Sequence, residues 1–122
     1  MRRGIQAYGG NTMRTIFLNT SIVTAPGTYT YSAASIDQVL SLMQAGEHTG
    51  IPTLSAIGHA STAEIMSELL HTKIEVNRIE YRAEVGDVAV VFKLRGRPPE
   101  GKIFTREEIE SLGYDFGLLS RT

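Results

Sequence analysis

The sequence contains no cysteine, which excludes a disulfide scaffold, thiolate zinc sites and cysteine nucleophiles. Charged residues are also few, at 20% of 122 residues, and 12 Lys and Arg against 13 Asp and Glu give a net charge of -1. A hydrophobic content of 42% does not match a disordered chain, and the length is typical of one compact domain. Because long nucleic acids favour a strongly basic domain, we expect no such partner.

A long uncharged stretch runs over residues 15–36 and is long enough to suggest a membrane span. It contains Pro26, Gly27 and many hydroxyl side chains, so we do not interpret it as one. No apolar run follows Arg2 and Arg3, so the N-terminus lacks the pattern of a signal peptide. We therefore expect a cytoplasmic protein that does not enter a membrane.

The positive charges are unevenly distributed along the chain. No Lys or Arg occurs between residues 15 and 72, whereas eight occur between Lys73 and Arg106, together with five acidic residues. A local basic surface on a nearly neutral protein suits a small anion. On charge alone, a solvated strand face with ion pairs is the simpler interpretation.

Hydrophobic patterning predicts both helices and strands. Residues 1–12 are polar and rich in glycine, so we interpret them as an extension ahead of a single domain over residues 13–122. Capping boxes predict helices over about residues 35–44, 61–71 and 105–113. Strands are predicted over residues 15–18, 28–31, 53–57, 78–83 and 88–94, with a tight turn between the last two. We expect an α+β (mixed α/β) fold with a single mixed sheet flanked by helices.

The strongest local candidate for a site is Gly58-His59-Ala60-Ser61-Thr62, which leads from a predicted strand into a predicted helix. A helix N-terminus presents unpaired N–H groups and the positive end of the dipole, and it therefore favours phosphate. Gly58 allows a ligand to approach the backbone, and Ser61 supplies a hydroxyl donor. His59 can donate a proton to a departing oxygen near neutral pH, or it can simply pack at the helix entrance.

Other kinds of catalytic site find little support. The three histidines have no metal-binding spacing, and neither a nucleophile elbow nor a phosphate-binding glycine loop is present. We expect no metal and no cofactor. An anion site made of His59, a helix start and arginines fits RNA transesterification. In this reaction the 2′-hydroxyl attacks the neighbouring phosphate, and the protein orients the ligand, neutralises charge and protonates the leaving oxygen.

Five ordered blocks carry a family resemblance. They are Asn19 after the first strand, SAIGHASTAEI at residues 55–65, VNR at residues 76–78, Gly86-Asp87, and RPPEGK at residues 97–102. Together with the C-terminal segment, they resemble the viral type III anti-CRISPR ring nucleases and their bacterial relatives. The resemblance covers residues 14 to about 121.

The resemblance implies a metal-independent homodimer that degrades cyclic tetra-adenylate, the second messenger of type III CRISPR defence, to linear di-adenylates and so switches off the signal. Carried over by position, His59 is the catalytic acid, and Arg97 and Glu100 position the ring and the scissile phosphate. The ligand-binding residues that the resemblance implies are Asn19, Ser61 and Arg78. We add Gly58 to the predicted binding residues, because it allows the ligand to approach the backbone.

The chain departs from that family after Asn19. Several relatives have a serine three residues further on, where this chain has Ile22. Ser21 or Thr24 is the candidate to replace that contact, unless the contact is lost. A non-catalytic sensor of a cyclic oligonucleotide would use the same helix entrance and arginines, so the sequence leaves both functions open.

Overall fold

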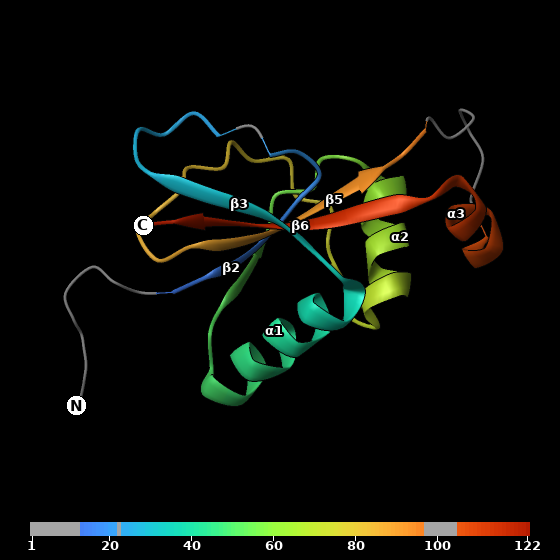
Figure 1. Ribbon diagram of the computed structural model, residues 1–122, viewed down its shortest axis with the longest axis horizontal. Coiled ribbons are helices and arrows are strands. Elements are labelled where there is room, and N and C mark those ends of the chain that lie inside the picture. Colours follow the sequence, from blue (N-terminus) through green and yellow to red (C-terminus); the bar gives the residue numbers. More distant parts are fainter. Residues whose placement is uncertain (1–12, 22, 97–104) are drawn as a thin grey trace.

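The computed structural model describes residues 13–21, 23–96 and 105–122. In these ranges five strands form one sheet in the order β3-β6-β5-β2-β4 (Figure 1). The strands are β2 (Thr15–Leu18), β3 (Tyr29–Ala34), β4 (Thr53–Ser55), β5 (Val88–Leu94) and β6 (Tyr114–Arg121). β2 pairs in parallel with β4 and β5, whereas β6 is antiparallel to β5 and β3. The predicted α+β class with a single mixed sheet is therefore confirmed.

All three described helices pack on one face of this sheet (Figure 1). They are α1 (Ile36–Thr49), α2 (Ala60–Leu70) and α3 (Arg106–Leu112). Apolar side chains of all three helices belong to one buried cluster with Phe17, Val90, Phe92 and Phe116 of the strands. None of the described helices is long and apolar enough to cross a membrane.

Irregular segments of the chain cover the opposite face. Side chains alternate along each strand, so Ile16 and Leu18 lie on this second face while Phe17 lies under the helices. Val23 and Tyr81, both outside the strands, pack against the second face. Helices therefore cover one face of the sheet, and irregular segments cover the other.

Two of the three predicted capping boxes are present. Ser35 and Thr105 each accept a hydrogen bond from the backbone N–H three residues later, and the return bond is also made. The helix after Ser35 ends at Thr49 and not near Gln44. Gly46 does not interrupt it, because this glycine is buried and packs closely against Ile51 and the strand β2.

The prediction that a helix begins at Ser61 is wrong. His59 is the N-cap of α2, and its carbonyl oxygen accepts from the N–H of Ala63 at 3.1 Å. The helix begins at Ala60, so Ser61 lies inside its first turn and cannot cap it.

The predicted strand over residues 78–83 is also wrong. Both edges of β5 are occupied, by β2 and by β6, so a hairpin partner has no place beside it. Tyr81 instead packs across the second face of the sheet, and its hydroxyl donates to Asp87 Oδ2 at 2.7 Å. The antiparallel partner of β5 is the C-terminal strand β6. The predicted extension over residues 1–12 lies outside the described residues, so the proposed division into an extension and one domain stays a prediction.

Candidate functional site

The carboxyl ends of three neighbouring strands meet at one edge of the sheet. β4, β2 and β5 are adjacent and parallel, so the residues that follow them come together there. Asn19 follows β2, Gly58 and His59 follow β4, and Lys93 is the second-last residue of β5. In open sheets with parallel strands, ligands bind outside such carboxyl ends.

The connection from β4 to α2 is held by the segment around Asn77. The backbone N–H of Asn77 donates to the Ile57 carbonyl at 2.8 Å, and its side-chain Nδ2 donates to the Ser55 carbonyl at 2.7 Å. Ser55 Oγ donates in turn to the Glu75 carbonyl at 2.5 Å. These bonds fix the backbone immediately before His59.

Arg78 lies beside this turn. Its Nε donates to the Gly58 carbonyl at 2.9 Å, which fixes one edge of an exposed guanidinium. Among the described residues, neither terminal nitrogen of Arg78 makes an ion pair or hydrogen bond. A Cβ at position 58 would meet only Arg78 Cγ, at 3.7 Å, so the fold itself has room for a side chain there.

The N-terminus of α2 lacks a side-chain cap. His59 is exposed, has an extended backbone, and makes no side-chain hydrogen bond to the first turn. The first turn contains no acidic residue, whereas α1 and α3 each have a capping box and an acid in the first turn. The positive end of the α2 dipole is thus left uncompensated by the chain itself.

A lysine extends this edge toward β5. Lys93 is exposed, and its Nζ is 3.5 Å from Ser21 Oγ, which makes this a long contact. Asn19 and Ser21 are partly buried on the loop after β2, and Thr24 is exposed. Lys93 was not predicted as a site residue, because its position at the carboxyl edge depends on the order of the strands in the sheet.

The structure brings part of the predicted set together. Gly58, His59, Ser61 and Arg78 lie at one strand-to-helix turn, and Asn19 and Ser21 lie at the exit of the neighbouring strand. Arg97, Glu100 and Ile22 lie outside the described residues. Within the described ranges, no group of three or more His, Asp or Glu side chains is arranged to hold a metal ion.

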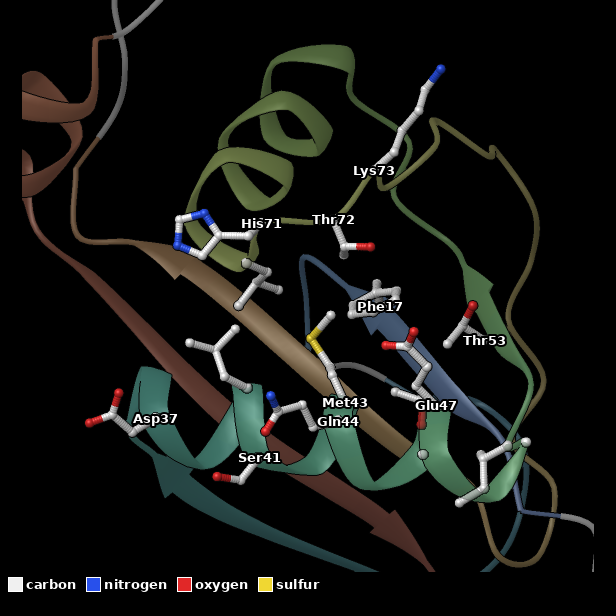
Figure 2. A pocket seen from close by; sticks show the side chains of 16 residues that line it. Phe17, Asp37, Ser41, Met43, Gln44, Glu47, Thr53, His71, Thr72 and Lys73 are labelled. Carbon is white, nitrogen blue, oxygen red and sulfur yellow. The ribbon is translucent and has the colours of Figure 1, made fainter.

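A groove lies elsewhere, between α1 and the C-terminal end of α2 (Figure 2). Its volume is about 960 Å³, and Phe17 and Met43 contribute apolar surface while His71 and Thr72 lie on the α2 side. None of the described site residues lines it. His59 stands at the opposite end of α2, which is roughly 16 Å long at the standard helical rise.

The fold is shared with a viral protein of solved structure. The chain superposes on B116 of Sulfolobus turreted icosahedral virus (STIV) with a TM-score of 0.73 and 22% identity, over 88% of this chain and 99% of that one. The profile of the STIV B116-like family matches residues 15–116. The chain belongs to this family.

Sequence relatives come from a bacterium and from viruses. Uncharacterized protein YddF of Bacillus subtilis (strain 168) is 36% identical over 109 residues, which is 89% of this chain and 98% of YddF. Uncharacterized protein ORF116 of Acidianus filamentous virus 1 is 31% identical over 85 residues, which is 70% of this chain and 73% of that protein.

Proposed function

We propose that this protein is a ring nuclease that binds cyclic tetra-adenylate and cleaves it without a metal ion into linear di-adenylates. Cleavage would switch off the signal of type III CRISPR defence in the cytoplasm. The observation that carries the proposal is the turn between β4 and α2, where an uncapped helix N-terminus, His59 and the fixed guanidinium of Arg78 meet. The resemblance of residues 55–65 to the ring nucleases supports this substrate.

The distribution of polar groups along the carboxyl edge suits a ligand with several phosphates. β4 and β5 lie on either side of β2, so their exits are separated by about 10 Å, or two strand spacings. Arg78 stands at one exit and Lys93 at the other, with Asn19 between them. The N–H groups of α2 and the free nitrogens of Arg78 would donate charge-assisted hydrogen bonds to phosphate oxygens.

The proposed reaction uses a nucleophile from the substrate. The 2′-oxygen of one nucleotide bonds to its neighbouring phosphorus, the bond from phosphorus to the 5′-oxygen breaks, and a cyclic phosphate forms. His59 gives its proton to the departing 5′-oxygen, and the 2′-hydroxyl proton passes to water. In this proposal Arg97 and Glu100 position the ring and the scissile phosphate.

A two-fold dimer completes the proposal. Cyclic tetra-adenylate has two-fold symmetry, and an isologous dimer would place one His59 beside each of two opposite phosphates. Two cuts would then release two di-adenylates, which agrees with the products that the family resemblance implies.

The decisive experiment is to incubate the purified protein with cyclic tetra-adenylate in excess EDTA and to separate the products. We expect linear di-adenylates, formed at the same rate with and without the chelator. Tight binding without any product would favour a non-catalytic sensor. Activity that vanishes with EDTA and returns with a divalent ion would contradict the metal-independent mechanism.

A further inference from the structure

The chain leaves the sheet at the end of β4, just before His59. β4 is an edge strand, and β2 is the strand that pairs with it. The N–H of Ala56 donates to the Phe17 carbonyl of β2 at 3.0 Å. Because neighbouring residues of a strand direct their backbone groups to opposite edges, the carbonyls of Ser55 and Ile57 face the outer edge of the sheet. Backbone carbonyls that are not fully solvated need a donor there.

One residue supplies a donor to each of these two carbonyls. Asn77 Nδ2 donates to the Ser55 carbonyl at 2.7 Å, and the Asn77 N–H donates to the Ile57 carbonyl at 2.8 Å. Val76 forms a parallel bridge with Ile57, so residues 75–77 run beside the end of β4 like a short additional strand. The partly buried side chain of Asn77 thus belongs to the outer edge of the sheet.

The turn to α2 begins directly after the second of these carbonyls and contains Gly58 and His59. Arg78 follows Asn77 in the chain and donates from Nε to the Gly58 carbonyl at 2.9 Å. The side chain of His59 makes no hydrogen bond to the first turn of α2. The two bonds of Asn77 therefore hold this turn, together with Arg78, against the end of β4.

We propose that Asn77 is a positioning residue for the cleavage reaction, because it fixes His59 relative to the neighbouring strand exits. Asn19 and Lys93 stand at the exits of β2 and β5, so a ligand bound there meets His59 correctly only while the turn is held in register with these strands. A displacement of about 1 Å between reacting groups can slow a reaction by about 10²-fold. The inference rests on the proposed function and adds to it a residue that acts through His59 without touching the ligand.

Asn77→Ala tests this role, because it removes the amide and keeps the backbone N–H. Under single turnover, cleavage of cyclic tetra-adenylate should slow by about 10–100-fold. In a His59→Ala background the same change should cause no further slowing, because the group that Asn77 positions is absent. Affinity, measured in that slow background, should change far less than the rate, because Arg78 and the N–H groups of α2 remain.

Ser67→Ala is the matched control on the same segment. Ser67 Oγ accepts from the Ile74 N–H at 2.8 Å and donates to the Ala63 carbonyl at 2.6 Å. It therefore holds the beginning of the segment to α2, about two helical turns from His59. Both variants lose a partly buried side-chain hydrogen bond, so urea unfolding should show similar losses of stability. The cleavage rate of Ser67→Ala should nevertheless match that of the wild type.

Backbone amide signals report on the turn in the absence of substrate. In a proton–nitrogen correlation spectrum of the free protein, Asn77→Ala should shift the N–H signals of Gly58 and His59. The N–H at position 77 should also exchange faster with solvent in this variant. Ser67→Ala should leave these signals in place.

The positioning role of Asn77 is contradicted by a cleavage rate that ignores Asn77→Ala, by equal slowing in Ser67→Ala, or by the same slowing with and without His59. Unshifted amide signals at the turn contradict it as well. A wild type that cleaves, together with any of these results, overturns the role of Asn77 alone. A wild type whose amide signals respond but which cleaves nothing contradicts the proposed function, and the positioning role in cleavage falls with it.

Discussion

Arg14 and Asp87 form a bidentate ion pair between positions 73 residues apart in the sequence. Arg14 Nε lies 2.9 Å from Asp87 Oδ1, and Nη2 lies 2.7 Å from Oδ2. Asp87 is only 1% exposed, and it also accepts from the Tyr81 hydroxyl and the Glu84 N–H. This carboxylate therefore joins the starts of β2 and β5 to the segment that covers the second face of the sheet.

We expect Asp87→Asn to destabilise the protein by about 3 kcal/mol, because it leaves a partly buried guanidinium without its partner. Urea unfolding measures the loss of free energy. Asp115→Asn is the matched control, since Asp115 forms a similar bidentate pair with Arg95 on the surface. That variant should unfold almost like the wild type, and equal losses in both variants would contradict the role of burial.

The same carboxylate predicts a dependence of stability on pH. Burial alone would raise the pKa of Asp87, but hydrogen bonds from Arg14, the Glu84 N–H and Tyr81 outweigh it, and the pKa falls below its usual 3.8. Its stabilisation is therefore complete above the usual value and is lost as the pH falls through the lower pKa of the folded state. The difference in unfolding free energy between wild type and Asp87→Asn should shrink on acidification below pH 4. A constant difference between neutral and strongly acidic pH would argue against this account.

His59→Ala separates a catalyst from a sensor. Because His59 is exposed and makes no capping bond, its loss should leave the fold and the α2 N-terminus intact. The chemical step under single turnover should slow by roughly 10²–10⁴-fold, the usual contribution of a general acid. Binding of cyclic tetra-adenylate should change far less, because Arg78 and the helix N–H groups remain. Cleavage at the wild-type rate would leave His59 as a packing residue.

Gly58→Ala tests whether a ligand approaches the backbone at the turn. The added methyl group meets only Arg78 Cγ at 3.7 Å, so the unfolding free energy should stay the same or rise by up to ~1 kcal/mol. Calorimetric affinity for cyclic tetra-adenylate should nevertheless fall, since the methyl group occupies space beside the N–H groups of α2. Unchanged affinity would mean that the ligand stays away from this glycine.

Local sequence signals predicted the parts of the fold that local chemistry determines. The helix starts after Ser35 and Thr105 depend on side chains three residues apart, and both were predicted correctly. The strand over residues 78–83 failed because alternation of side chains describes any half-buried extended segment. Whether such a segment pairs in a sheet depends on which edges are free, and β6 had already taken that edge of β5.

The candidate site likewise combines residues that a local pattern could predict with residues that only the folded structure brings together. The turn at Gly58 and His59 was found because its residues are consecutive, and Arg78 entered through the family resemblance. Lys93 and the support from Asn77 were missed, because both depend on strand order and on hydrogen bonds between distant segments. Nothing in a local pattern indicates that Asn77 Nδ2 meets the carbonyl of Ser55.

The position of β6 in the sheet constrains when the protein can fold during its synthesis. β6 is the last of the described strands in sequence order, yet it lies between β3 and β5 and is the strand with which β3 pairs. While the ribosome still holds residues 114–121, β3 has no sheet to join and its backbone groups stay exposed. The parallel strands β2, β4 and β5 can assemble with α1 and α2 on the nascent chain, whereas β3 joins the sheet only after β6 has emerged from the ribosome.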